Sequence, residues 1–264
     1  MDALHRPVEA LMREVAAGIM MPRFRDLNAG EISEKTPGDY VTDVDHLSEA
    51  RITEALLALL PGSIVVGEEA VAADPALMAR VTDDIAWIVD PLDGTANFAA
   101  GRTPFAIMIA LAEAGEIRAG WILDPVTGRM CHAARGQGMF LDGERVRTRP
   151  TTGALPVAAL ATRYLPAEVR ADVEARIVGR IESVEVPNCT GEQYPRLLLG
   201  ENDIALFWRS MAWDHAPGAL MVEEAGGRIA RLDGAPYRLG DERTGLLAAA
   251  SPRLWDEAHV MLFG

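Results

Sequence analysis

A continuous apolar run that ends in two carboxylates constrains this chain more than any other stretch. Residues 85–89 are Ile-Ala-Trp-Ile-Val, and Asp90, Pro91, Leu92, Asp93 and Gly94 follow directly. The apolar run predicts a buried strand, and Pro91 and Gly94 predict a rigid, tight reversal around its end. Two carboxylates near a core require a positive counter-charge. Because residues 85–98 contain no Lys or Arg, a hard divalent cation such as Mg²⁺ is the predicted counter-charge.

Two further segments also place acidic residues at the ends of apolar elements. Glu68 and Glu69 follow Gly67 after the short apolar stretch 64–66, and Asp214 lies at the start of a predicted helix. Asp-Pro and Asp-Gly pairs alone are also ordinary turn chemistry, which leaves the first segment open to two interpretations. Acidic residues at three separate element ends favour a shared site.

In this order, the segments resemble the signatures of the inositol monophosphatase family, which comprises Mg²⁺-dependent, lithium-sensitive phosphatases. The matching stretches are Gly-Glu-Glu at 67–69, Asp-Pro-Leu-Asp-Gly-Thr at 90–95 and Trp-Asp at 213–214. The resemblance implies a five-layer αβαβα sandwich, as in inositol monophosphatase and fructose-1,6-bisphosphatase. It also implies a homodimer and two or three Mg²⁺ ions in each site.

The resemblance assigns roles to individual residues. The implied metal ligands are Glu68, Asp90, the Leu92 carbonyl, Asp93 and Asp214. Thr95 and Asp45 would orient and deprotonate the attacking water, with Glu69 as a partner behind them. The implied substrate contacts are Lys35, Asp93, Gly94, Thr95 and Asp214. Without the resemblance, Lys35 and Asp45 would pass as surface charges.

These residue types suit the hydrolysis of a phosphate monoester, which is extremely slow without a catalyst. Metal ions clamp the phosphoryl oxygens and lower the pKa of a bound water. Two ions a short distance apart need bridging carboxylates, which Asp90 and Asp93 would provide. The predicted function is therefore a Mg²⁺-dependent phosphomonoesterase that acts on a small phosphorylated metabolite, such as an inositol, sugar or polyol phosphate.

Two positions depart from the inositol-specific pattern of the family. Phe207 stands where those enzymes carry a glutamate that contacts a ring hydroxyl, and residues 188–192 (Asn-Cys-Thr-Gly-Glu) replace a pocket-lining segment of small residues. Loss of a hydrogen-bonding group usually changes which ligand a site accepts. Histidinol phosphate and 3′-phosphoadenosine nucleotides therefore remain alternative substrates. A catalytically silent metal- or phosphate-binding regulatory protein remains an alternative function.

Composition narrows the class of protein. The formal net charge is −14, which argues against nucleic acid or anionic membrane as partners. Two cysteines without a CxxC motif suggest a reducing compartment. Neither a signal-peptide core nor a long uncharged apolar stretch is visible in the sequence, so a cytoplasmic enzyme is expected. The sequence also lacks the HExxH, GxSxG and P-loop motifs.

Periodicity predicts two halves. Residues 1–148 would form a half with an antiparallel sheet, and in residues 149–264 helices would alternate with short strands and complete the site. Helices are predicted over residues 2–26, 43–60, 167–182, 193–199, 213–225 and from Ser251 to near the end. Thr42 or Asp43 would cap the second helix and Ser251 the last. Strands are predicted over 64–66, 85–89, 105–111, 117–123, 130–134, 158–161, 184–186, 204–207, 228–230 and 246–250.

Overall fold

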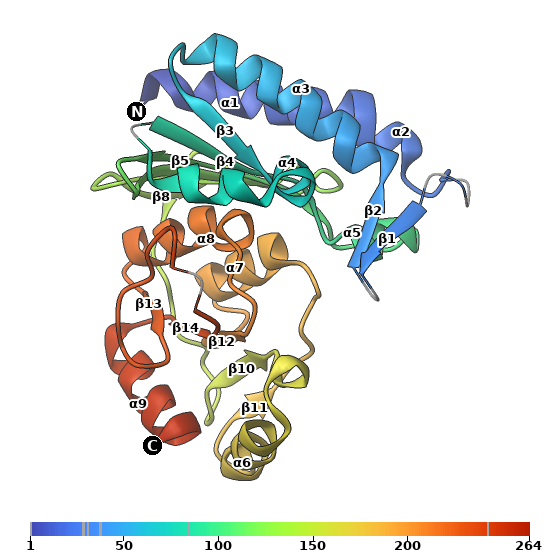
Figure 1. The fold of residues 1–264 in the computed structure, drawn as a ribbon. Coiled ribbons are helices and arrows are strands. Elements are labelled where there is room, and N and C mark those ends of the chain that lie inside the picture. Colours follow the sequence, from blue (N-terminus) through green and yellow to red (C-terminus); the bar gives the residue numbers. More distant parts are fainter. Residues whose placement is uncertain (1, 28–29, 31, 37–38, 84, 242) are drawn as a thin grey trace.

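Five alternating layers of helix and sheet make up the computed structural model, which describes residues 2–27, 30, 32–36, 39–83, 85–241 and 243–264. Figure 1 shows helices α1 (Asp2–Val15) and α3 (Asp43–Leu59) above the first sheet, with α7 (Thr190–Leu199) and α8 (Ala212–Glu224) below it. A second sheet follows, and α6 (Ala167–Ile177) and α9 (Pro252–Phe263) form the last layer. The predicted αβαβα sandwich is confirmed.

The first sheet has seven strands in the order β3-β4-β5-β6-β7-β8-β9. Their bounds are β3 (Ile64–Gly67), β4 (Ile85–Asp93), β5 (Ala106–Glu113), β6 (Glu116–Leu123), β7 (Met130–Ala134), β8 (Gly138–Leu141) and β9 (Glu144–Val146). β3 pairs with β4 in parallel, and every later pairing is antiparallel. The antiparallel part is the predicted meander.

Both faces of this sheet are covered, which explains the continuous apolar runs in its strands. Trp87 and Val89 pack in one cluster with residues of α1 and α3, whereas Ile88 packs on the opposite face with residues of α7 and α8. Since side chains alternate across a strand, a strand buried on both faces needs apolar residues at every position.

The second sheet has the order β11-β10-β12-β14-β13. Its strands are β10 (Val157–Leu160), β11 (Glu182–Ser183), β12 (Ile204–Phe207), β13 (Arg228–Arg231) and β14 (Leu246–Ala249). β10 pairs in parallel with β11 and β12, whereas β14 pairs antiparallel with β12 and β13. α8 packs between the two sheets, and its residues share one apolar cluster with both of them.

Several short elements join these layers. They are the π-helical turn η1 (Ala16–Met20), α2 (Met21–Arg23), α4 (Glu68–Ala73), the 3₁₀-helices η3 (Pro75–Thr82) and η4 (Thr162–Tyr164), and α5 (Thr95–Ala99). Thr42 caps α3 by accepting from the Val44 amide, and Ser251 caps α9 by accepting from the Leu254 amide. Both caps are as predicted.

Three local predictions need correction. The helix expected over 167–182 ends at Ile177, because Gly179 takes a left-handed φ of 68°. The strand expected at 184–186 is wrong, since the paired residues are Glu182 and Ser183. The antiparallel pair β1 (Ile32–Thr36) and β2 (Asp39–Thr42) was not predicted, and the turn expected at Pro37-Gly38 lies outside the described residues.

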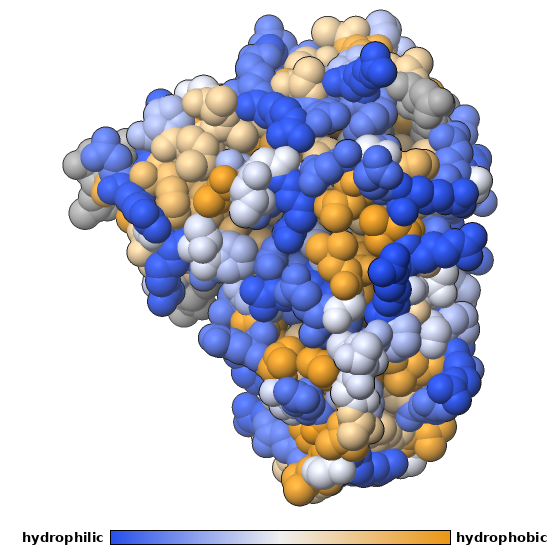
Figure 2. All heavy atoms as spheres, turned by 180° about the vertical axis from the view of Figure 1, so that it is seen from behind, coloured by the Kyte–Doolittle hydropathy of each residue, from blue (hydrophilic) through white to orange (hydrophobic). Residues whose placement is uncertain are grey.

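The back face of the molecule carries separate apolar patches divided by hydrophilic side chains (Figure 2). In the described part of the chain, no helix is both long enough and apolar enough to cross a membrane.

Candidate active site

The carboxyl end of β4 forms the centre of the site. Asp90 is buried, and its Oδ1 accepts a hydrogen bond from the Leu92 amide at 3.0 Å. The pairing of β4 with β5 shifts register between Asp90 and Asp93, which is the irregularity that a proline in this strand requires. Gly94 then takes a φ of 87° as the N-cap of α5, and a Cβ there would lie 3.0 Å from the Pro104 carbonyl oxygen. Only glycine meets both conditions.

Glu68 begins α4, and a residue of α3 fixes this segment. Glu49, which is buried, accepts hydrogen bonds from the Glu69 amide at 2.8 Å and the Ala70 amide at 2.7 Å. Its carboxylate occupies the space above Gly67, where an added Cβ would lie 2.3 Å from Glu49 Cδ. The predicted Gly-Glu-Glu segment therefore depends on a carboxylate that sequence reasoning missed.

Asp214 lies in the first turn of α8, where the helix dipole favours a negative charge. The neighbouring His215 is buried; its Nε2 is 2.9 Å from the Arg209 carbonyl oxygen, and its Nδ1 is 2.7 Å from the Tyr194 hydroxyl. Since a carbonyl only accepts, Nε2 carries the proton and Nδ1 accepts from Tyr194. Burial lowers the pKa of His215 to about 4, so the ring is neutral and supports the start of α8.

Glu68, Asp90, Asp93 and Asp214, which the sequence predicted as ligands, line one cavity of about 410 Å³. Burial raises the pKa of Asp90 well above its usual range, and the charges of Glu68, Asp93 and Asp214 raise it further. Burial, Asp93 and Glu68 likewise raise the pKa of Asp214, against the opposing effect of Arg209. The four carboxylates therefore destabilise one another's ionised forms in the absence of a cation.

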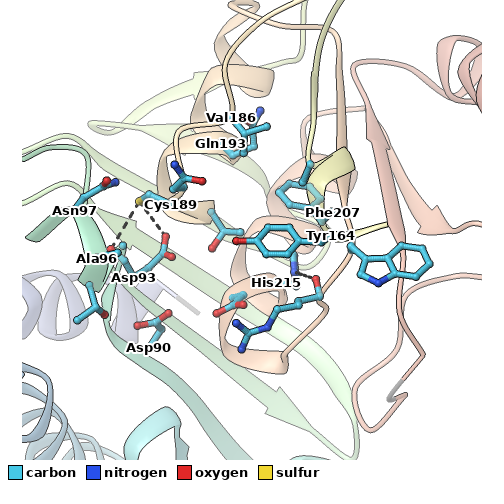
Figure 3. A pocket seen from close by; sticks show the side chains of 18 of the residues that line it. Asp90, Asp93, Ala96, Asn97, Tyr164, Val186, Cys189, Gln193, Phe207 and His215 are labelled. Carbon is cyan, nitrogen blue, oxygen red and sulfur yellow. Dashed lines mark hydrogen bonds between the residues drawn. The ribbon is translucent and has the colours of Figure 1, made fainter. Parts of the chain in front are cut away.

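Asp93 is fixed by the start of α7. Its Oδ2 accepts hydrogen bonds from the Gly191 amide at 2.5 Å and from Cys189 Sγ at 3.0 Å. Figure 3 shows the contact with Cys189. With this arrangement, no three His, Cys, Asp or Glu side chains among the described residues form a ready-made metal cage. The donor set nevertheless fits Mg²⁺, because it consists of mutually repelling carboxylates and hard oxygen atoms.

A second hydrogen-bonded group lies beside these carboxylates. Asp45 Oδ2 accepts from the Thr42 amide at 2.8 Å and the Thr42 hydroxyl at 2.6 Å, and its Oδ1 is 3.1 Å from Thr95 Oγ1. Thr95 Oγ1 also lies 2.9 Å from the Leu92 carbonyl oxygen. Burial raises the pKa of Asp45 to about 6, although its hydrogen bonds with Thr42 act in the opposite direction.

The remaining predicted residues lie at the edge of this arrangement. Glu69 is buried, its charge contributes to the raised pKa of Asp45, and His46 Nδ1 lies 3.8 Å from Glu69 Oε2. Lys35 belongs to β1, but its side chain lies outside the described part of the structure.

The far wall of the cavity combines Phe207, which the sequence had singled out, with residues that it had not. Phe207, the predicted departure from the inositol pattern, lines the cavity with Arg163, Tyr164, Trp208 and Arg209. Figure 3 shows Phe207 and Tyr164 on segments of the chain other than the strand that presents Asp90 and Asp93. These wall residues come from η4 and from the end of β12, and no motif connects them in the sequence.

Comparison with known proteins identifies the family of this chain. A model described as the inositol monophosphatase family matches residues 4–263. The Nus factor SuhB of Pseudomonas aeruginosa is 31% identical over 234 residues, which are 86% of this chain and 85% of that protein. The inositol-1-monophosphatase of Bacillus subtilis is 26% identical over 229 residues, which are 86% of this chain and 84% of that protein.

Solved structures agree over the whole chain. The IMPase of Thermotoga maritima has a TM-score of 0.82 at 24% identity and covers 99% of this chain and 97% of its own. The extragenic suppressor protein suhB of Bartonella henselae has a TM-score of 0.81 at 26% identity and covers 97% of this chain and 98% of its own. The chain belongs to the inositol monophosphatase family.

Proposed function

We propose that this protein is a Mg²⁺-dependent phosphomonoesterase that hydrolyses a small phosphorylated metabolite. In this proposal Glu68, Asp90, the Leu92 carbonyl, Asp93 and Asp214 hold two or three Mg²⁺ ions. When bound, the ions would neutralise the phosphoryl oxygens and lower the pKa of a water. The observation that supports the proposal most is the contact between Asp45 and Thr95 beside these carboxylates.

Asp45 and Thr95 have the geometry to remove a proton from the attacking water. One threonine hydroxyl has one proton, so Thr95 donates either to Asp45 or to the Leu92 carbonyl at a given moment. When it donates to Asp45, its lone pairs can accept a hydrogen bond from water. As the water oxygen bonds to phosphorus and the P–O ester bond breaks, the water proton passes to Thr95 and the Thr95 proton passes to Asp45. The ester oxygen leaves as an alkoxide and takes up a proton from solvent water. A pKa of about 6 suits Asp45 to this task near neutral pH.

The backbone after Asp93 would bind the phosphoryl group. Thr95 begins α5, and the first amide groups of a helix have no partner within the helix. Because α5 has only five residues, the Gly94 and Thr95 amides would act as individual hydrogen-bond donors and not through a long helix dipole.

Phosphate release from a substrate panel tests this proposal. The panel contains inositol 1-phosphate, fructose 1,6-bisphosphate, histidinol phosphate and 3′-phosphoadenosine 5′-phosphate, each with Mg²⁺, with EDTA, and with Mg²⁺ plus lithium. We expect release that requires Mg²⁺ and is inhibited by lithium. Release that persists unchanged in EDTA would contradict the metal-dependent mechanism.

The relatives named Nus factor favour a second candidate, a catalytically silent binding protein on the same fold. Mg²⁺ binding by calorimetry without release from any substrate in the panel would support this candidate. Turnover of a single panel substrate that is lost in the Asp93→Asn variant would exclude it.

A further inference from the structure

The cavity has two chemically different ends. Its carboxylates, among the described lining residues, are Glu68, Asp90, Asp93 and Asp214, all of which belong to the proposed metal set. The wall formed by η4 and the end of β12 contributes Arg163 and Arg209 and no described carboxylate, and of the two it is Arg209 whose charge acts on Asp214. A substrate whose phosphate lies at the acidic end therefore presents its leaving group to a wall with cationic and aromatic side chains.

Arg163 is held in a defined orientation by neutral groups. Its Nη2 donates to the Tyr164 hydroxyl and to Asn188 Oδ1, each at 2.5 Å. The guanidinium carbon also lies 4.5 Å from the centroid of the Tyr164 ring. An aromatic ring and neutral acceptors orient a guanidinium without neutralising its charge with a carboxylate.

Part of the Arg163 hydrogen-bonding capacity is unused. A guanidinium has five N–H donors, and the two hydrogen bonds to Tyr164 and Asn188 both come from Nη2. Within the described residues, neither Nε nor Nη1 has a recorded partner, and Arg163 forms no ion pair with a carboxylate. Because Nη2 makes both hydrogen bonds, neither two-nitrogen edge of the guanidinium is free, and Nε and Nη1 remain available as single charge-assisted donors.

The same wall disfavours two other kinds of leaving group. Phe207 is buried and presents an apolar ring where a polyol hydroxyl would need an acceptor. A leaving group with an ammonium, as in an amino alcohol, would approach Arg163 and Arg209 without a described carboxylate outside the metal set. Both features favour a leaving group with a negative charge.

We infer that Arg163 is a specificity-determining residue that selects phosphate monoesters whose leaving group carries a second anionic group, a carboxylate or a phosphate. The inference rests on the proposed phosphatase function of the same site. Arg163 would bind this second anion through its Nε–H or Nη1–H donors, while Tyr164 and Asn188 keep the guanidinium in place.

Matched substrate pairs test the inference. Glycerol 3-phosphate against 3-phosphoglycerate, and glucitol 6-phosphate against 6-phosphogluconate, replace a terminal CH₂OH by a carboxylate at two chain lengths. Fructose 1-phosphate against fructose 1,6-bisphosphate adds a second phosphate and separates the two kinds of anion. We expect the anionic member of at least one pair to have a kcat/KM about tenfold higher, mainly through KM, as for a charge-assisted hydrogen bond.

Three variants assign the preference to Arg163. Arg163→Gln should remove it, and Arg163→Lys should restore part of it, because lysine keeps the charge but not the planar guanidinium. Asn188→Asp should also remove it, since a carboxylate would then pair with Arg163 while the side-chain shape is kept. Arg180→Gln, which removes an exposed arginine outside the cavity, is the matched control and should leave the preference intact.

The outcomes separate this inference from the proposed function. Release from several substrates with equal kcat/KM within every pair, or with a preference unchanged in Arg163→Gln, would overturn the role of Arg163 and leave the phosphatase proposal standing. If no substrate is hydrolysed, the phosphatase proposal fails. Calorimetric binding of 6-phosphogluconate and glucitol 6-phosphate then tests the role of Arg163 by itself. Tighter binding of 6-phosphogluconate that is lost in Arg163→Gln would support the anion site, and equal binding would overturn it.

Discussion

Individual side chains outside the proposed ligand set hold the segments that carry the metal ligands in place. Glu49 is the clearest case, because its buried carboxylate binds the Glu69 and Ala70 amides directly after Glu68. Asn97 acts similarly beyond Asp93: its Nδ2 donates to the Pro104 carbonyl at 2.8 Å and to the Pro187 carbonyl at 3.1 Å. Both residues tie a ligand-bearing segment to a separate part of the chain.

Removal of the Glu49 carboxylate should damage both stability and metal binding. Glu49→Ala leaves two amides without their acceptor, and we expect a loss of about 2 kcal/mol in the free energy of unfolding. We also expect a higher Mg²⁺ requirement, because Glu68 is no longer held. Urea denaturation and a Mg²⁺ titration measure the two effects. Glu54→Ala, an exposed change on the same helix, is the control, and an equal effect there would contradict this role.

His215 should make stability depend on pH. Its pKa is about 4 in the folded protein and about 6.5 in an unfolded chain, so the unfolded state binds more protons between these values. Stability should therefore fall as the pH is lowered from 6.5 to 4, by about 3 kcal/mol from this residue. Denaturation curves over this range, compared with those of His215→Gln, measure the effect. A variant with the same pH slope as the wild type would refute the assignment.

At the scale of secondary structure, the sequence predicted the helices and strands whose buried residues follow a regular pattern. Strands β4 and β5, which are buried on both faces, occur in the sequence as apolar runs. Helices α3 and α9 are marked by their N-cap residues, Thr42 and Ser251. The stretch 184–186 shows the limit of this reasoning, since Val-Glu-Val alternates like a strand. Pairing nevertheless ends at Ser183, and Val186 lines the cavity.

The candidate site was predictable to the extent that its residues occur in compact motifs. All three motifs contribute residues to the wall of one cavity, namely Glu68, Asp90, Leu92, Asp93, Gly94, Thr95, Trp213 and Asp214. Glu49 and Arg163 could not be identified, because their roles come from contacts made across the fold. Gly67 was the available signal for Glu49, since its missing side chain makes room for the carboxylate.

The connection between β13 and β14 depends on a buried arginine. Arg231 is buried and binds Asp241 Oδ2 at 3.1 Å, the Asp241 carbonyl at 2.6 Å and Ser210 Oγ at 2.8 Å. Asp241→Asn removes the counter-charge, and we expect a loss of about 3 kcal/mol in the free energy of unfolding. Arg231→Met should be less damaging, because it leaves no buried charge.

The pH dependence of this element has a defined sign. The hydrogen bond from Arg243 lowers the pKa of Asp241, and the charge of Arg231 also contributes. The stabilisation by the ionised Asp241 carboxylate is therefore present above the unfolded pKa of about 3.9. It is lost as the pH falls through the lower pKa of the folded protein. Thermal melts of Asp241→Asn and Arg231→Met measure these losses of stability. Asp256→Asn, which removes an exposed ion pair to Arg228, is the control. Equal losses for Asp241→Asn and Asp256→Asn would contradict it.

At the scale of the whole molecule, the fold places acidic residues from separate layers around one cavity. Glu68 and Asp90 come from the first sheet and its edge, and Asp214 comes from a helix between the two sheets. The net charge of −14 makes this a strongly acidic protein that is proposed to bind an anionic substrate. Bound divalent cations, as proposed, would resolve this conflict, because they would reverse the sign of the local charge.

The proposed role of these carboxylates as Mg²⁺ ligands is best tested by a Mg²⁺ titration of phosphate release, on a substrate that the wild-type protein hydrolyses. The account predicts saturable activation of the wild type, a sharply higher Mg²⁺ requirement for Glu68→Gln, and a folded but inactive Asp93→Asn. Glu54→Gln should match the wild type. An unchanged Mg²⁺ titration for Glu68→Gln, together with most of the activity retained in Asp93→Asn, would contradict the account.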